Sequence, residues 1–338
     1  MGRTISIGNQ SFADIREHGD FMVDKTSFIR EWWDARDQVT LITRPRRFGK
    51  TFNLSMLEAF FSTKYAGRAD LFAGLNIWAD EEMRALQGTL PVIFLSFADI
   101  KEGTFESARA KTCRVLADAF KAHADELGAQ ARDWDGPEPP YGISPTMDDA
   151  TAASSIKLLC SLLERKTGKR PIVLLDEYDT PMQEAWAGGF WDKAVGFMRP
   201  LLNSTFKTNP SLERGLLTGI TRVSKESIFS DLNNLTDITM DVRFSSLLGY
   251  THDEVRSCFP QRLAALAQTL GTDVDGAFAR LVDMYDGYCF DRSMTRVFNP
   301  VSLGRCLDSA DIRSYWFETG TPGWLMSYAK RQPMEVES

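Results

Sequence analysis

The sequence predicts an α/β protein in which a parallel β-sheet is flanked by helices. Four apolar runs of strand length recur, at residues 39–42, 91–97, 172–175 and 216–220. Segments with helical periodicity separate them, and this alternation is expected when crossover helices connect parallel strands. Three of the runs end in polar or charged residues, so we expect functional residues at the carboxyl ends of the strands.

The first run leads into the segment TRPRRFGKT, residues 43–51. Pro45 biases the residue before it away from helix, whereas Gly49, Lys50 and Thr51 open an amphipathic segment with an apolar stripe at residues 54, 57 and 61. We therefore predict a strand, a loop and a helix in this order. The backbone N–H groups of such a loop point toward the helix N-terminus and form a site for phosphate.

This segment fits the phosphate-binding pattern G-x-x-x-x-G-K-[ST] except at its first glycine, where Arg44 stands. A Gly-Lys-Thr sequence alone is more often an ordinary loop, so the assignment depends on the other strand ends. In a nucleotide site, Lys50 would reach the β- and γ-phosphates and the Thr51 hydroxyl would bind Mg²⁺. The predicted nucleotide-binding residues are Arg46, Arg47, Phe48, Gly49, Lys50, Thr51 and Phe52.

Two adjacent acids, Asp176 and Glu177, follow the buried run of residues 172–175. At the end of a core strand an aspartate can hold Mg²⁺, while the next glutamate orients and deprotonates an attacking water. The alternative is a strand that simply ends in solvated acids. We predict Asp176 as a metal ligand and Glu177 as a catalytic residue. Asp179 is either a third carboxylate near the metal or a turn former.

The run of residues 216–220 finishes in Thr221 and Arg222. We expect its end to lie beside the other two strand ends, so that Arg222 acts in catalysis by responding to the γ-phosphate. The alternative is a strand followed by a polar loop. Residues 238–240 are the candidate fifth strand. The order of phosphate loop, acidic strand and sensor-like strand favours a P-loop NTPase over three coincidences.

Several separated segments then resemble, in order, the bacterial AAA-ATPase-like family. They are IGNQSFADIREHGDFMVDKTSFI, TRPRRFGKTFNLSML, LLDEYDTP, GITRVSKESIFSDLNN, MYDGYCF, FNPVSLG and YWFETGTPGWLM. The resemblance implies a P-loop ATPase of the additional-strand, AAA-like type, in which TRPRRFGKT is the phosphate loop. The sequence departs from the family at Met22, where tyrosine is usual. Members are often fused to a nuclease of the PD-(D/E)XK type, and we expect none here because no D…(D/E)xK set is found near the end.

The functional prediction is Mg²⁺-dependent ATP binding and hydrolysis that powers or switches a partner acting on nucleic acid. The alternative is a non-hydrolysing, ATP-dependent interaction module that recruits a separate effector. The partners that the resemblance suggests are a nuclease or another effector protein, nucleic acid through a local basic surface, and a second copy of the chain. ATP is preferred to GTP because no guanine-reading Asn/Thr-Lys-x-Asp motif is present.

The chain is divided by prediction into an ATPase core, residues 1–243, and a C-terminal helical or winged-helix-like lid domain, residues 244–338. Helical spacing dominates after Ser245, and Thr251 with Glu254 forms the pattern of a capping box. Arg292 or Arg296 of this domain would be able to reach nucleotide, and the sequence selects neither. In the N-terminal segment, Asp24 and Lys25 are candidate nucleotide neighbours.

Composition sets the outer limits of these predictions. A formal net charge of −7 and a pI of about 5.2 argue against a surface adapted to bulk nucleic-acid binding. The five cysteines are scattered and without CxxC spacing, and the three histidines do not cluster, so a disulfide framework and a zinc site are not expected. The sequence has no apolar stretch of membrane-spanning length and no signal-peptide core. We therefore expect a cytoplasmic protein without a membrane partner.

Overall fold

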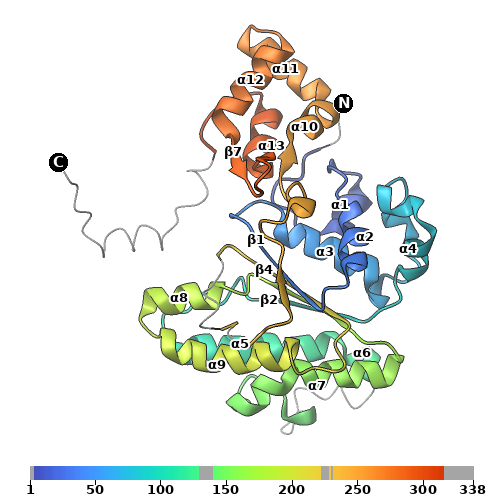
Figure 1. Ribbon diagram of the computed structural model, residues 1–338, viewed down its shortest axis with the longest axis vertical. Helices are drawn as coiled ribbons and strands as arrows, with labels where there is room; N and C mark the ends of the chain where they lie inside the picture. Colours follow the sequence, from blue (N-terminus) through green and yellow to red (C-terminus); the bar gives the residue numbers. More distant parts are fainter. Residues whose placement is uncertain (1–3, 129–139, 222–227, 230, 316–338) are drawn as a thin grey trace, which may run out of the picture.

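A computed structural model describes residues 4–128, 140–221, 228–229 and 231–315. Its centre is a five-stranded, fully parallel sheet in the order β2-β3-β4-β1-β5. The strands are β1 Val39–Thr43, β2 Val92–Ser96, β3 Ile172–Asp176, β4 Arg214–Gly219 and β5 Leu235–Asp237. The α/β class and the parallel sheet that the sequence predicts are confirmed (Figure 1).

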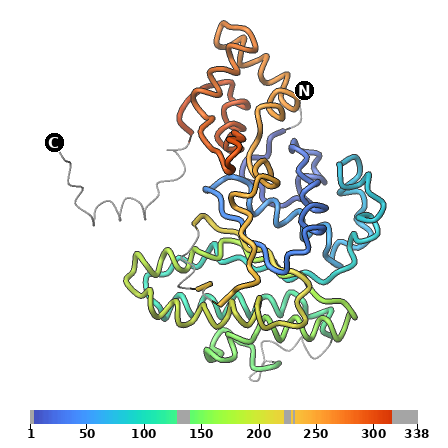
Figure 2. Tube along the Cα trace, in the orientation of Figure 1, coloured from blue at the N-terminus to red at the C-terminus, as the bar shows by residue number. Residues whose placement is uncertain are grey.

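Helices cover both faces of the sheet. One face carries α1 Phe12–His18, α2 Ser27–Ala35, α3 Lys50–Phe61 and α4 Glu81–Leu86. The other carries α5 Phe105–Ala122, α6 Ala124–Leu127, α7 Asp149–Thr167, α8 Thr180–Gly188 and α9 Trp191–Phe206, which form the lower layer in Figures 1 and 2.

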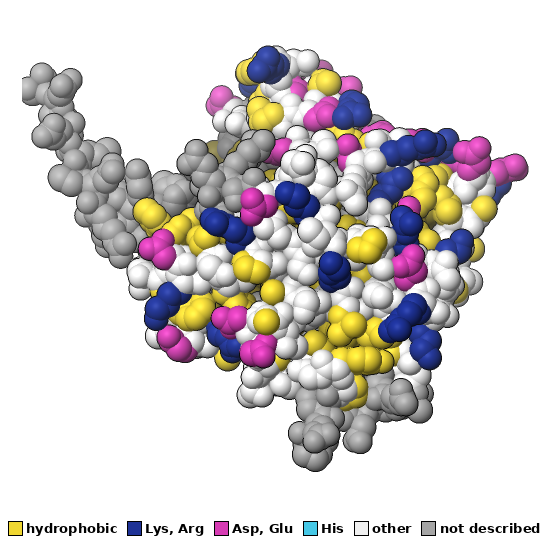
Figure 3. All heavy atoms as spheres, turned by 60° about the horizontal axis from the view of Figure 1, so that its bottom comes forward, with side chains coloured by type: hydrophobic (Ala, Val, Ile, Leu, Met, Phe, Trp, Pro, Cys, Tyr) yellow, Lys and Arg dark blue, Asp and Glu magenta, His cyan; other side chains and the backbone are white. Residues whose placement is uncertain are grey.

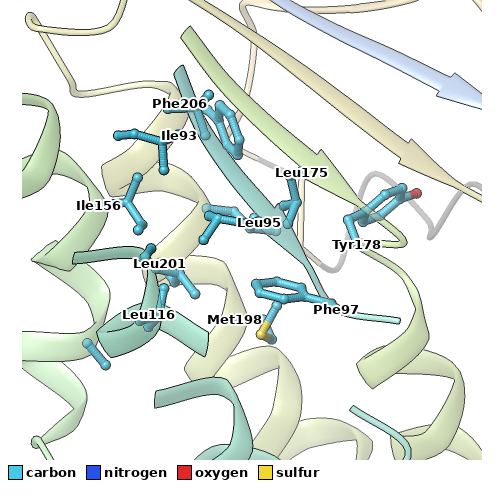
Figure 4. Close-up of a cluster of buried hydrophobic side chains, with 14 of the residues drawn as sticks. Ile93, Leu95, Phe97, Leu116, Ile156, Leu175, Tyr178, Met198, Leu201 and Phe206 are labelled. Carbon is cyan, nitrogen blue, oxygen red and sulfur yellow. The ribbon is translucent and has the colours of Figure 1, made fainter. Parts of the chain in front are cut away.

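Strand side chains alternate between the two apolar clusters that these helices complete. In β3, Val173 and Leu175 pack with one cluster, whereas Ile172 and Leu174 pack with the other. Figure 4 shows the first cluster, with β2 and β3 side chains packed against α5, α7 and α9. A strand that is buried on both faces reads as a continuous apolar run, which is why the sequence located β3 correctly.

Three element boundaries differ from the sequence-based expectation. The candidate fifth strand at residues 238–240 is wrong, because β5 ends at Asp237 and the Thr239 hydroxyl, not a backbone carbonyl, accepts the N–H of Thr43. β4 ends at Gly219, one residue earlier than expected. From the sequence, helical spacing runs through residues 104–127 and predicts one long helix. The structure breaks this helix at His123, whose imidazole pairs with Glu126 of the short helix α6.

The C-terminal module, residues 245–315, lies above the sheet in Figure 1 and is not purely helical. It contains the antiparallel sheet β6-β8-β7 and four helices. The elements are β6 Tyr250–Thr251, α10 His252–Cys258, α11 Pro260–Leu270, α12 Val274–Tyr285, β7 Asp286–Cys289, β8 Arg296–Phe298 and α13 Pro300–Ser309. The predicted capping box of Thr251 and Glu254 opens α10.

The N-terminal segment joins the C-terminal module to the sheet. Phe12, the first residue of α1, packs in the core of the sheet, whereas Phe21 and Val23 pack in the apolar cluster of the C-terminal module. The rings of Phe21 and Phe259 pack at a tilt, with centroids 4.4 Å apart. Lys25 donates to the carbonyl of Ser246 and pairs with Glu254, the residue that completes the capping box. Residues 12–25 therefore connect the sheet to the module.

Candidate active site

The loop of residues 44–49 leaves the end of β1 and enters α3. Its start is fixed to the neighbouring strand, because the N–H of Arg44 donates to the carbonyl of Gly219 over 3.1 Å. Two of its residues adopt positive φ, Arg47 at 70° and Gly49 at 81°. Gly49 is the residue before the helix, and its left-handed backbone turns the chain into α3 at little steric cost. The strand, loop and helix order predicted from the sequence is confirmed.

Lys50 lies beneath this loop with only 6% of its surface exposed. Its ammonium donates to the carbonyls of Arg44 and Pro45, at 2.9 and 3.0 Å. Burial lowers the pKa of Lys50, and the carboxylates of Glu177, Asp176 and Asp179 oppose that change. The partners that hold the ammonium are neutral carbonyls, so its charge stays available to an anion bound by the loop.

Thr51 and Asp176 meet directly. The Thr51 hydroxyl donates to Oδ2 of Asp176 over 2.7 Å, and the Thr218 hydroxyl of β4 donates to Oδ1 over 2.5 Å. Asp176 is 1% exposed, and burial raises its pKa against the effect of these two hydrogen bonds. A hydroxyl beside a carboxylate is the oxygen donor set that Mg²⁺ accepts, usually together with water and substrate phosphates. These residues therefore fit the metal that the sequence predicts.

Glu177 follows Asp176 but faces a different environment. Its backbone has a φ of 49°, an uncommon conformation for a non-glycine residue, and its side chain is half-buried. The Thr180 hydroxyl donates to Oε2 over 3.0 Å. Glu177 lines the cavity beside the loop, whereas Asp176 does not. A carboxylate held by one hydroxyl at the cavity wall is suited to accept a proton from water.

Asp179 ties the end of β3 to the segment after β4. Its Oδ2 accepts the N–H groups of Ile220 and Thr221 at 3.0 and 2.8 Å, the Thr221 hydroxyl at 2.9 Å and the amide of Gln183 at 2.6 Å. The carboxyl is fully buried, which raises its pKa. The sequence predicts that the ends of β3 and β4 lie side by side. Hydrogen bonds of Asp179 thus join the two ends. Arg222, predicted as the γ-phosphate sensor, lies outside the described residues.

A cavity of about 540 Å³ opens next to the loop. All seven residues predicted to bind nucleotide, 46–52, line it, together with Glu177 and Lys101. The remaining walls come from Ile15 of α1, Asn53 of α3, the N-terminal segment and the C-terminal module. The N-terminal segment supplies Ile5–Gln10, Phe21, Met22, Val23 and Lys25, and the C-terminal module supplies Leu247, Gly249, Tyr250, Pro300, Val301 and Arg305.

Arg305 and Lys101 are cavity residues that sequence reasoning missed. Arg305 stands on α13, and its charge, after burial, contributes to the lowered pKa of Arg47 on the loop. Arg292 and Arg296, the two candidates from the sequence, do not line the cavity, and Arg296 pairs with Asp286. No local pattern marks Arg305, because its place depends on how α13 packs over the loop. Of the two N-terminal candidates, Lys25 lines the cavity and Asp24 does not. The carboxylate of Asp24 accepts the backbone N–H groups of Thr26 and Asn76.

A second surface hollow of about 470 Å³ lies at the junction of α8 and α9, lined by Trp186, Phe190 and Trp191 among others. Phe197, another aromatic residue of α9, packs in the core instead. None of the residues around Lys50 and Asp176 lines this hollow.

Comparisons with known proteins identify a family and a similar protein for this chain. The family model described as predicted AAA-ATPase matches residues 6–229. A protein of Azotobacter chroococcum mcd 1, described as an uncharacterized protein in the vnfD 5' region, is 32% identical over 331 residues. The alignment covers 96% of this chain and 55% of that relative, so this chain spans about half of the relative's length. Among the described residues, no helix is long and apolar enough to cross a membrane.

Proposed function

The chain belongs to the predicted AAA-ATPase family, and on this premise we propose that it binds ATP with Mg²⁺ and hydrolyses it in the cavity beside the loop of residues 44–49. The observation that carries the proposal is the 2.7 Å contact between Thr51 and Asp176. It brings the loop and the acidic strand together at one edge of the sheet, with Lys50 beneath the loop and Glu177 at the cavity wall.

Each of these groups has one role in the proposed reaction. The loop N–H groups, Lys50 and the flanking arginines neutralise the phosphates. Thr51 with Asp176 would hold Mg²⁺, and the metal would supply further charge neutralisation. Glu177 accepts the proton of the attacking water. Phosphoryl transfer needs mainly positioning and electrostatic stabilisation, and this set of residues supplies both.

The sheet order supports the additional-strand type of P-loop ATPase. β4 lies between β1, which carries the loop, and β3, which carries the acids. The end of β4 therefore falls beside the γ-phosphate position, where Thr218 orients Asp176. Asp179 holds the segment that leads toward Arg222, the residue we assign to γ-phosphate sensing.

The nucleobase is assigned to the apolar part of the cavity between the N-terminal segment and the C-terminal module. Ile5, Ile7, Val23 and Val301 line this part, and Arg305 approaches the loop from α13. In this reading the C-terminal module acts as a lid, because a bound nucleotide contacts both the loop and α13.

The proposed biological role is to power or switch a partner that acts on nucleic acid. Its support is the family alone, since neither comparison names a partner. On the face seen in Figure 3, lysine and arginine side chains are interspersed with acidic ones, so we assign nucleic-acid contact to the partner rather than to this face. A second copy of the chain is the proposed source of an arginine that completes the site.

A non-hydrolysing switch that recruits a separate effector is the second candidate. The same cavity would serve it, and Glu177 distinguishes the two functions. A carboxylate at the cavity wall can accept a proton from the attacking water, which favours the ATPase.

The deciding experiment measures Mg²⁺-dependent phosphate release and ATP affinity for the wild type, Lys50→Ala and Glu177→Gln. The ATPase proposal expects turnover by the wild type, binding without turnover by Glu177→Gln, and loss of binding by Lys50→Ala. Equal ATP binding by all three proteins with no hydrolysis, even when DNA or RNA is added, would support the switch and remove Lys50 from its role.

A further inference from the structure

Arg44 points away from the cavity, although it stands in the loop that binds phosphate. The side chain is 1% exposed and does not line the cavity. Its guanidinium donates to the carbonyls of Thr43, Thr239 and Phe244, the last two from the segment that leads into the C-terminal module. The position that is glycine in the general pattern is thus occupied by a buried anchor.

The guanidinium of Arg44 also stacks on the C-terminal module. Its Cζ lies 4.0 Å from the ring centroid of Phe290, the residue that follows β7. A cation over an aromatic face in a buried setting is a favourable contact, and it is stronger where water is excluded. Arg44 therefore links the loop to the hairpin of β7 and β8.

Phe48 makes the same connection from the other end of the loop. Its ring packs edge-on against Tyr288 and Phe290, with centroids 4.8 and 5.4 Å away. Asn299, which caps α13, donates to the carbonyl of Arg46 over 3.3 Å. The loop is therefore held along its length by side chains of residues 288–299.

A phosphate loop binds through backbone N–H groups, so its affinity depends on how well those groups are fixed before the ligand arrives. In this chain Arg44 and Phe48 both fix the loop to the hairpin, and Arg44 does so from outside the cavity. We propose that Arg44 and Phe290 are a positioning pair through which the C-terminal module holds the loop in its phosphate-binding conformation. The inference rests on the proposed function for its ligand, and docking of the hairpin and nucleotide affinity are then coupled.

The test is a double-mutant cycle with a matched control pair. Arg44→Met removes the cation, Phe290→Leu removes the aromatic face, and Phe290→Tyr keeps it. The control is a second arginine-aromatic pair of the C-terminal module, Arg256 over Phe278 at 3.9 Å, which does not contact the loop. Arg256→Met and Phe278→Leu make the same chemical changes at a distance from the site.

Two readouts separate positioning from folding. The first is hydrogen exchange of the loop amides without nucleotide, and the second is ATP affinity. Arg44→Met and Phe290→Leu each speed exchange and weaken ATP binding, on the order of tenfold, and the double variant is no worse than either single variant by more than about twofold, because the two residues act as one unit. Phe290→Tyr behaves as the wild type, and the control pair changes neither readout.

The outcomes distinguish this inference from the proposed function. If the wild type binds no ATP but loop exchange follows the pattern above, the ATPase proposal falls and the positioning pair stands. If the wild type binds ATP while exchange and affinity are unchanged in Phe290→Leu, the positioning pair is refuted. Additive effects of the two substitutions, or equal losses in the control pair, also overturn it, because they indicate general destabilisation.

Discussion

The hydroxyl of Thr51 donates to the carboxylate of Asp176 over 2.7 Å, although the two residues are 125 positions apart in the chain. This contact joins the first turn of α3 to the last residue of β3. It is possible because β1 and β3 are parallel and separated by one strand, so their carboxyl ends lie on the same edge of the sheet.

Replacement of Thr51 by valine is expected to remove the Mg²⁺-dependent part of ATP affinity. Valine keeps the branched shape and loses the hydroxyl, which costs about 1.5–3 kcal/mol for a hydrogen bond to a charged group. Calorimetric titration of ATP with and without Mg²⁺ measures the difference. Thr51→Ser is the matched control and retains it. Equal Mg²⁺ dependence in Thr51→Val and the wild type would show that this hydroxyl is not a metal ligand.

The affinity for Mg²⁺-ATP is expected to fall as pH is lowered, beginning above the ordinary pKa range of an aspartate. Burial raises the pKa of Asp176, and a protonated carboxyl does not bind Mg²⁺. The same raised pKa means that the folded, metal-free protein binds more protons than the unfolded chain. The contribution of Asp176 to the free energy of unfolding therefore falls as the pH rises from the pKa of this carboxyl in the unfolded chain to its pKa in the folded protein.

The control for this pH dependence is Asp176→Asn, which has no group to titrate at this position. ATP titrations at fixed Mg²⁺ over a series of pH values should show the loss in the wild type and a flat, weak affinity in the variant. A wild-type curve that stays level until the pH range of an exposed aspartate would contradict the role of Asp176.

Gly219→Ala is expected to destabilise the protein by about 1–3 kcal/mol, the usual cost of overpacking. A Cβ at this position would lie 2.6 Å from Oδ1 of Asp179 and 2.7 Å from the ring of Tyr178, so the join between β3 and β4 must shift. Chemical denaturation measures the loss. Gly196→Ala in α9 is the matched control, because its Cβ meets nothing within 4 Å, and a gain of about 0.5–1 kcal/mol is expected there. Equal effects of the two substitutions would argue against a tight join.

Arg305→Gln is expected to weaken ATP binding by about 1.5–3 kcal/mol, the range for hydrogen bonds to charged groups, and to affect adenosine little. The reason is that Arg305 approaches the loop side of the cavity, where the phosphates are proposed to lie. Binding of ATP, ADP and adenosine at two salt concentrations measures the effect. Arg280→Gln, an exposed substitution in the same module, is the control. An equal loss for adenosine would place Arg305 at the base instead.

Local patterns allowed much of the site to be predicted. The apolar run of β3 and the two acids after it are contiguous in sequence, and so are Gly49, Lys50 and Thr51 at the start of α3. The period of the side chains and the polarity at the strand ends were enough to locate these residues. The structure confirms that residues 46–52 line one cavity together with Glu177.

The errors arose where a contact distant in sequence decided the outcome. The fifth strand lies at Leu235–Asp237 rather than at residues 238–240, where the Thr239 hydroxyl instead of a backbone carbonyl accepts the N–H of Thr43. Lys25 and Asp24 are adjacent, but only Lys25 lines the cavity. Lys25 forms an ion pair with Glu254, whereas Asp24 accepts the backbone N–H of Asn76. Such choices depend on which elements pack together, and propensity is only a weak guide to that.

By itself the sequence determined the α/β class, the parallel strands, the loop before α3 and the acidic end of β3. Each of these features follows from a pattern of residues that are neighbours along the chain. Only the tertiary structure decided the strand order and the positions of two arginines. Arg44 lies outside the cavity and over the ring of Phe290, and Arg305 lines the cavity beside the loop. These features come from packing between segments far apart in sequence, where burial and close contact select one arrangement among many that the local patterns allow.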